Sequence, residues 1–317
     1  MKRLVDKKGR RVNYLRISVI PLCNMKCIYC YKEKVVLNKE RMMSPSEIGK
    51  IVEIFSNLDE VKIRLTGGEP LLRNDIVDIV REIISRGINS LFITTNGALL
   101  KKYAFPLKEA GLKRINVSLD SLKEKNFERI TGGGKLQEVL DGIEEAKKAG
   151  FESIKINVVL LRGINDDEIW DFISFAESNG FVLRFIEVMP VGLKNWERYF
   201  ISQDEVFKKL SSAIDWKAPN VIDGPARYYK LKNGFEIGFI SPISHNFCER
   251  CSRLRITYDG YLRACLLGGK EYDILSLLRE GKEEEVISVI KGAISEKPAK
   301  GISAEVSSGR RMVEIGG

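Results

Sequence analysis

Six short apolar, β-branched runs alternate with amphipathic helical patterns over the first 220 residues, and this alternation most constrains the fold. Strands separated by helices pair in parallel, with right-handed crossovers. We therefore predict a parallel sheet, buried on both faces and curled into a full or partial barrel. The predicted strands are Tyr14–Ile20, Val61–Thr66, Leu91–Thr95, Arg114–Leu119, Ile154–Leu161 and Val182–Val188.

Residues at the helix ends support this alternation. Ser44–Glu47 has the pattern of a capping box with proline at the first helical position. Glycines such as Gly87 and Gly180 follow helical patterns, where a left-handed residue is expected to end a helix. The other predicted helices are Asp75–Arg86, Leu99–Ala110, Leu136–Ala149 and Asp166–Ser178.

The pattern changes after about residue 220. Ala226–Lys232 and Phe235–Ser241 flank Asn233-Gly234, which predicts a β-hairpin. Helical patterns follow near Tyr272–Arg279 and Glu283–Ser295. We therefore expect two domains, a partial barrel over 1–220 and a smaller α+β domain over 221–317.

The six cysteines form two groups with over two hundred residues between them. Cysteines in a long cytosolic chain are more often metal ligands or catalytic groups than disulfides. Three thiolates can hold three irons of a [4Fe-4S] cluster and leave the fourth iron open. A structural zinc or other metal site is the alternative for each group. The expected ligands are Cys23, Cys27 and Cys30 (C-x3-C-x2-C) and Cys248, Cys251 and Cys265 (C-x2-C-x13-C).

Charge and hydropathy exclude some classes of protein. Lys and Arg exceed Asp and Glu by nine but are spread along the chain without an aromatic-interleaved basic stripe, which disfavours nucleic-acid binding. A solvated surface or an acidic, phosphorylated ligand would each explain the excess. No apolar run approaches the ~20 residues of a membrane span, and the start MKRLVDKKGRR lacks the apolar stretch of a signal peptide. We expect a cytoplasmic protein without a membrane or nucleic-acid partner.

Polar or glycine-rich elements follow successive predicted strands. They are the first cysteine group, then Gly67–Pro70, Thr94–Gly97, Ser118–Asp120 and Glu187–Pro190. Working groups gather at the carboxyl ends of the strands in a parallel barrel. The sequence therefore predicts one shared site at this end.

Two of these elements carry a family resemblance. Cys23–Cys30, with Tyr29 before the last cysteine, and Gly67–Pro70 after the second strand resemble the radical S-adenosylmethionine (SAM) superfamily. The resemblance implies a partial (βα)6 barrel. It also implies that SAM chelates the open iron and is cleaved by one electron to methionine and a 5′-deoxyadenosyl radical.

Further blocks narrow the resemblance, over essentially the full length, to the GTP 3′,8-cyclase family (molybdenum cofactor biosynthesis protein A). Its members are lyases that use SAM to convert GTP to 3′,8-cyclo-7,8-dihydro-GTP in molybdenum cofactor (molybdopterin) biosynthesis. The resemblance implies a second [4Fe-4S] cluster on the C-terminal cysteines, with its open iron on the guanine. The blocks are Leu15–Ser18, Ile63–Leu71, Thr94–Gly97, Arg114–Asp120, Lys155–Val159, Arg184–Met189, Phe247–Arg255, Cys265 and Gly316-Gly317.

The same resemblance implies roles for individual residues. Arg253 and Arg255 are two apart, so in an extended segment both would face one side and could form a fork around a triphosphate. Ordinary packing is the alternative for Met189, and a frayed terminus for the last two residues. The implied SAM contacts are Tyr29, Gly68, Ser118 and Met189; the implied GTP contacts are Arg16, Arg64, Thr94, Lys155, Arg253, Leu254 and Arg255; and Gly316 and Gly317 are implied to support the early radical steps.

The resemblance also implies partners. An electron donor such as ferredoxin or flavodoxin would reduce the cluster, and cyclic pyranopterin monophosphate synthase would be the next pathway enzyme. A homodimer is left open. The alternative within the superfamily is a peptide-modifying or maturase enzyme with auxiliary clusters, which typically has more C-terminal cysteines than the three here.

Overall fold

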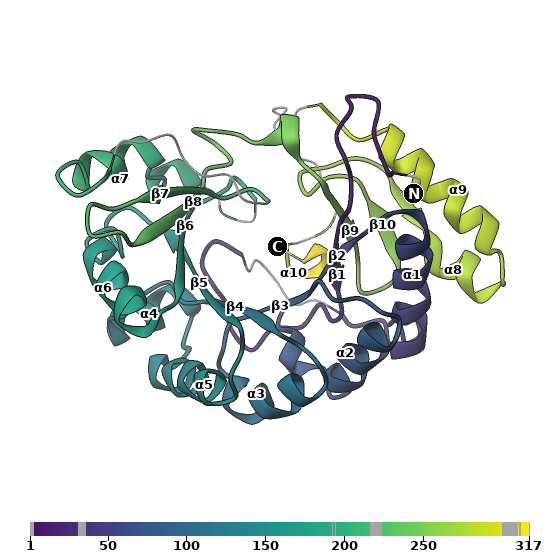
Figure 1. Cartoon of the computed structure of the whole chain (residues 1–317), viewed down its shortest axis with the longest axis horizontal. Helices are drawn as coiled ribbons and strands as arrows, with labels where there is room; N and C mark the ends of the chain where they lie inside the picture. The colour runs from purple at the N-terminus through teal and green to yellow at the C-terminus, as the bar shows by residue number, and fades with distance from the viewer. Residues whose placement is uncertain are drawn as a thin grey trace.

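The computed structural model describes residues 3–30, 36–191, 193, 195–215, 224–299, 310 and 312–316. Its strands form one open, strongly curved sheet in the order β11-β10-β9-β1-β2-β3-β4-β5-β6-β8-β7, as Figure 1 shows. The six predicted strands are confirmed and pair in parallel in chain order. They are β1 (Tyr14–Ser18), β2 (Lys62–Thr66), β3 (Leu91–Thr95), β4 (Arg114–Ser118), β5 (Ser153–Leu160) and β6 (Val182–Glu187).

Helices cover the outer face of this sheet (Figure 1). The capping box at Ser44 is present: its side chain accepts from the Glu47 N–H while Glu47 accepts from the Ser44 N–H. A short helix, α4, was not predicted. The helices are α1 (Pro45–Leu58), α2 (Ile76–Ser85), α3 (Leu100–Glu109), α4 (Glu124–Thr131), α5 (Leu136–Lys148), α6 (Ile169–Asn179) and α7 (Gln203–Lys209), with a 3-10 turn at Pro70–Leu72 and another at Trp196–Arg198.

The C-terminal region extends both edges of the same sheet. The predicted hairpin is present, and its second strand, β8, pairs in parallel with β6, while β9 pairs in parallel with β1. The proposed boundary at residue 220 falls outside the described residues and stays a prediction. The elements are β7 (Arg227–Lys230), β8 (Glu236–Ile240), a 3-10 turn (Cys248–Arg250), β9 (Arg253–Ile256), β10 (Tyr261–Arg263), β11 (Glu271–Asp273), α8 (Ile274–Arg279), α9 (Glu283–Ser295) and α10 (Met312–Ile315).

The two faces of the sheet differ: the outer face is packed against the helices, whereas the inner face, which we also expected to be buried, lines a cavity. Along β5, Ile154, Ile156 and Val158 are buried in the core, whereas Lys155 and Asn157 line a cavity. Side chains alternate between the faces of a strand, so every second residue is free to be polar. The barrel is therefore packed outside and hollow inside, with α10 in the middle (Figure 1).

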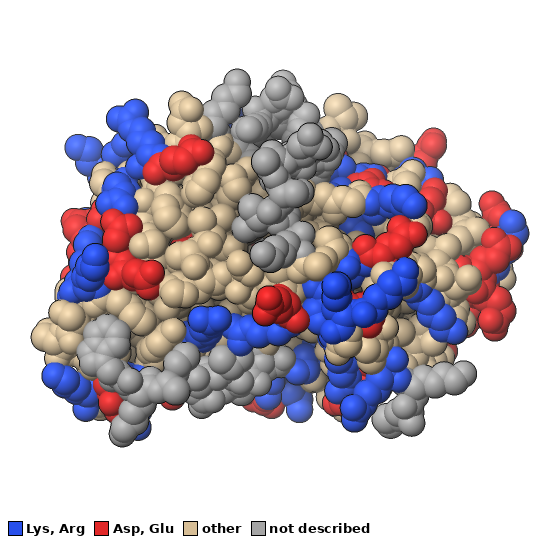
Figure 2. Space-filling view, turned by 90° about the horizontal axis from the view of Figure 1, so that it is seen from above, with Lys and Arg blue, Asp and Glu red and all other residues tan. Residues whose placement is uncertain are grey.

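No helix among the described residues is long and apolar enough to cross a membrane. Figure 2 shows Lys and Arg interspersed with Asp and Glu at both ends of one face. Part of the positive excess is therefore solvated surface.

Candidate functional site

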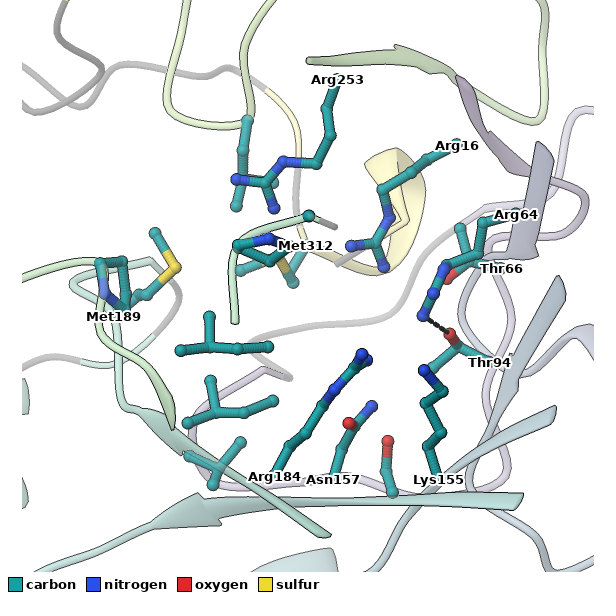
Figure 3. A pocket seen from close by; sticks show the side chains of 18 of the residues that line it. Arg16, Arg64, Thr66, Thr94, Lys155, Asn157, Arg184, Met189, Arg253 and Met312 are labelled. Atoms are coloured by element: carbon teal, nitrogen blue, oxygen red, sulfur yellow. Dashed lines mark hydrogen bonds between the residues drawn. The ribbon is translucent and has the colours of Figure 1, made fainter. Parts of the chain in front are cut away.

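A cavity of about 920 Å³ opens inside the curved sheet. It is lined by all six cysteines and by every SAM and GTP contact named above except Leu254, whose side chain lies in the hydrophobic core. The prediction of one shared site is thus confirmed in its geometry. Figure 3 shows side chains from separate strands converging on this space, among them Arg16, Arg64, Lys155, Asn157, Arg184 and Arg253.

The loop of the first triad is held between two other loops. The Gly68 N–H donates to the Ile20 carbonyl at 2.7 Å, and the Glu69 N–H donates to the Leu22 carbonyl at 2.7 Å. A Cβ at Gly68 would lie 2.1 Å from the Leu22 oxygen, so only glycine permits this approach. On the other side of this loop, the Lys26 N–H donates to the carbonyl of Thr131, the last residue of α4.

Two buried carboxylates lie near this triad. Glu69 accepts from the Thr95 hydroxyl at 2.7 Å and the Asn96 N–H at 2.7 Å, and burial raises its pKa to about 7. Asp120 accepts from the Tyr29 hydroxyl at 2.5 Å, and burial raises its pKa to about 6. This hydrogen bond fixes the hydroxyl of Tyr29, which immediately precedes the third cysteine in the sequence.

The thiols of the first triad interact with one another and with these carboxylates. Burial raises the pKa of Cys27 well above its usual range, and Asp120 adds to the shift. Burial and Cys23 raise the pKa of Cys30 to about 12. Buried sulfurs in negative surroundings ionise readily only when a cation joins them, which an iron-sulfur cluster supplies. The donor set therefore fits a thiolate-bound cluster.

A row of arginines crosses three neighbouring strands on the inner face. In the β9-β1-β2 register, Arg255 lies beside Arg16, and Arg16 lies beside Arg64. Burial lowers the pKa of Arg16 well below its usual range, and repulsion from Arg255 and Arg64 lowers it further. Like charges on adjacent strands are mutually destabilising, so the row favours a bound polyanion.

Other groups extend this row. Arg64 donates to the Thr94 hydroxyl at 3.0 Å, the contact dashed in Figure 3, and its Nε donates to the Tyr14 hydroxyl. Lys155 reaches the cavity from β5, and Ser118 and Met189 line it as well.

The second triad lies around the turn before β9 and the end of β10. Cys248 is in the 3-10 turn, and the Cys251 N–H donates to its carbonyl at 3.2 Å. Burial raises the pKa of Cys251, but Arg253 and Lys297 more than offset this and lower it to about 6. The cysteines of both groups are free thiols. No three metal-binding side chains of the described segments converge on a single metal ion, which disfavours a lone zinc ion at either triad; in a [4Fe-4S] cluster each thiolate binds a different iron.

The C-terminal tail enters the cavity region. Met312 and Val313 line the cavity, and Arg255 donates to the carbonyls of Ile315 and Gly316. Gly316 has φ +68°, and a Cβ there would lie 2.4 Å from Thr66 Cγ2. Gly317 lies outside the described residues.

Sequence reasoning did not single out several basic residues that line the cavity, of which Arg184 is the most buried. Arg184 is buried on β6, lines the cavity and donates from Nε to the Tyr228 hydroxyl at 2.6 Å. It pairs in register with Asn157, which is two residues from Lys155 on β5 and therefore shares its face. The sequence carries no local signal for this register, so the pairing of Arg184 with Asn157 could not be predicted from it.

Comparisons with known proteins agree over nearly the full length. A family model described as the radical SAM superfamily matches residues 17–176, and one described as Molybdenum Cofactor Synthesis C matches 181–302. The chain is 46% identical to the GTP 3′,8-cyclase of Thermodesulfovibrio yellowstonii, covering 98% of this chain and 99% of that protein. It is 43% identical to the GTP 3′,8-cyclase of Lactiplantibacillus plantarum, covering 94% and 92%.

A solved structure supports the fold. The crystal structure of Streptococcus suis SuiB bound to S-adenosylmethionine aligns with a TM-score of 0.60 and 15% identity. The alignment covers 86% of this chain and 65% of that one. The similarity shows the shared architecture.

Proposed function

The chain belongs to the radical SAM superfamily and, within it, to the GTP 3′,8-cyclase family, and from this premise we propose how one cavity divides the reaction between two ends. The reaction cyclises GTP in molybdenum cofactor biosynthesis. The cofactors of the family are SAM and two [4Fe-4S] clusters. When bound, they supply a carbon radical that removes H-3′ of GTP, so that C3′ can bond to C8 of the guanine.

The end of the cavity that is lined by the first cysteine triad, which we call the first end, would bind SAM. Cys23, Cys27 and Cys30 would hold the first cluster. Gly68 lets the loop of the first triad pack closely against the end of β2, because a side chain there would meet the Leu22 backbone, and Gly68 itself lines the cavity. Asp120 fixes Tyr29 by accepting a hydrogen bond from its hydroxyl. The remaining proposed SAM contacts, Ser118 and Met189, line the same cavity.

The end of the cavity that is lined by the second cysteine triad, which we call the second end, would bind GTP. Cys248, Cys251 and Cys265 would hold the cluster that faces the guanine. The row of Arg255, Arg16 and Arg64 is the observation that carries the proposal, because buried cations side by side repel one another and a bound triphosphate would offset that repulsion. The remaining proposed contacts are Thr94, Lys155, Arg253 and the backbone at Leu254.

The tail would support the placement of GTP. Arg255 donates to the tail carbonyls and also lines the cavity, so one guanidinium would serve both the tail and the nucleotide. We propose that Gly316 and Gly317 thereby contribute to the early radical steps. The protein's part is to hold H-3′ within reach of the radical and C8 within reach of C3′.

The partners are proposals from the family alone. They are ferredoxin or flavodoxin as electron donor, cyclic pyranopterin monophosphate synthase as the next enzyme, a homodimer as one assembly state, and the cytoplasm as the location.

Anaerobic reconstitution tests the function. The protein should bind about eight irons per chain, as two four-iron clusters require. It should form 5′-deoxyadenosine in a GTP-dependent manner together with a cyclised nucleotide. Absence of that nucleotide in protein with both clusters intact would reject the proposal.

A further inference from the structure

A buried lysine joins two segments of the second cysteine triad. Lys297 follows α9 and is only 7% exposed. Its Nζ donates to the carbonyl of Arg253 at 2.6 Å and to that of Ala264 at 2.6 Å. Arg253 is two residues after Cys251, and Ala264 immediately precedes Cys265. One ammonium group therefore connects the backbone beside two of the three ligands.

A buried arginine connects the third. Arg10 donates from Nη1 to the Cys248 carbonyl at 2.6 Å. Its Nη2 donates to the carbonyls of Lys297 at 3.1 Å and Pro298 at 2.9 Å. The segment that carries Lys297 is thereby fixed to the segment that carries Cys248, and two buried cations reach all three parts of the triad.

The two cations differ in their charge partners. Arg10 is paired with the buried carboxylate of Asp6 at 2.5 Å. Burial lowers the pKa of Lys297, and the groups that oppose this and favour its charged form are the Cys251 and Cys265 sulfurs. Lys297 therefore places a buried positive charge on the backbone of the Cys251 and Cys265 segments, through its hydrogen bonds to the Arg253 and Ala264 carbonyls.

A [4Fe-4S] cluster on three thiolates is an anion, and its reduction potential depends on nearby charge and on hydrogen bonds. We propose that Lys297 is a positioning residue of the second triad, a buried cation that holds the Cys251 and Cys265 segments together and favours reduction of the cluster they bind. This inference rests on the assignment of a cluster to this triad.

The test isolates the second cluster in the full-length chain with Cys23, Cys27 and Cys30 replaced by Ala. Iron content and the reduction potential, followed by electron paramagnetic resonance, are measured without GTP or SAM. Lys297→Met removes the charge and both hydrogen bonds, and Lys297→Arg keeps the charge. Lys291→Met, at an exposed position on α9, is the matched control.

We expect Lys297→Met to lose iron or to shift the potential to more negative values, with Lys297→Arg closer to the parent and Lys291→Met unchanged. Full iron content at the parent potential in Lys297→Met would overturn the inference. Equal iron loss in the Met and Arg variants, with an equal fall in the melting temperature of the iron-free protein, would also overturn it. A parent chain that binds no iron at this triad would instead contradict the proposed function.

Discussion

The first cysteine triad lies beside two buried carboxylates, whereas the second lies beside buried cations. Burial and neighbouring negative charge raise the pKa of Cys30 to about 12, but Arg253 and Lys297 outweigh burial and lower the pKa of Cys251 to about 6. The number of thiols is the same at both ends. The surroundings of the thiols therefore distinguish the two ends: carboxylates at the first suit the cationic sulfonium of SAM, and cations at the second suit a triphosphate.

The two ends also differ in how the chain builds them. The first triad lies on a single loop after β1, held by neighbouring loops. The second end exists only because β9 returns from the C-terminal region to pair with β1, which places Arg255 beside Arg16. The row of arginines is therefore a product of strand pairing between distant parts of the chain and not of one motif.

Removing one cysteine from each end should give the largest contrast. Both Cys27→Ala and Cys251→Ala should lose about half of the iron. Only Cys27→Ala should abolish 5′-deoxyadenosine formation, because the first triad is the proposed SAM site. Cys251→Ala should retain slow SAM cleavage that no longer depends on GTP, and should lose the cyclised nucleotide. Iron analysis and chromatography of both products measure this. Equal loss of SAM cleavage in the two variants would show that the ends are not separable.

Adding a methyl group to the C-terminal tail, by Gly316→Ala, should give the next largest loss of activity. Gly316→Ala would place its Cβ against Thr66 at a positive φ, so the tail should be displaced. Misplacement of reacting groups by about 1 Å can cost about 100-fold, and we expect a fall in kcat of that order. Gly292→Ala in α9, where a Cβ meets open space, is the control. An unchanged kcat in Gly316→Ala would contradict the proposed role of the tail in the radical steps.

Arginine variants test the basic end alone. Arg253→Ala and Arg255→Ala should each weaken GTP binding by about 10- to 100-fold, the worth of a hydrogen bond to a charged group, and spare SAM cleavage. Binding is measured by calorimetry on the reconstituted protein. Arg81→Ala, at an exposed ion pair with Asp78, should leave GTP affinity unchanged. Unchanged GTP affinity in both Arg253→Ala and Arg255→Ala would contradict the proposal that these arginines bind the triphosphate.

The smallest effect is expected at the acidic end. Tyr29→Phe removes the hydrogen bond to Asp120 and should weaken SAM binding about 5-fold, equivalent to about 1 kcal/mol, without changing GTP affinity. Tyr272→Phe removes a comparable hydrogen bond to the exposed Glu296 and is the control. A Tyr29→Phe variant that weakens GTP binding instead would reverse the assignment of the two ends.

Short-range sequence patterns predicted most of the strands and helices, because these elements depend on residues that are close together in the chain. The alternation of strands and helices, the capping box at Ser44 and the hairpin at Asn233-Gly234 are all present. The short helix α4 was missed because its eight residues bury only Phe127, Ile130 and Thr131, too few for a clear period.

Long-range pairing was beyond the sequence patterns. Nothing local indicates that β8 and β9 extend opposite edges of one sheet, or that Lys297 approaches the second triad. Arg184 was missed for a related reason, because its role depends on its register with Asn157 on the neighbouring strand. The cysteine ligands were accessible because their spacing is itself a local pattern.

The central claim is that the two ends open on one cavity, so that a radical formed at the first reaches the ribose of a nucleotide held at the second. GTP carrying deuterium at C3′ tests this most directly, with reconstituted protein, SAM and a reductant. The deuterium should appear in 5′-deoxyadenosine and be absent from the cyclised nucleotide. Unlabelled 5′-deoxyadenosine, formed while GTP keeps its deuterium, would contradict it.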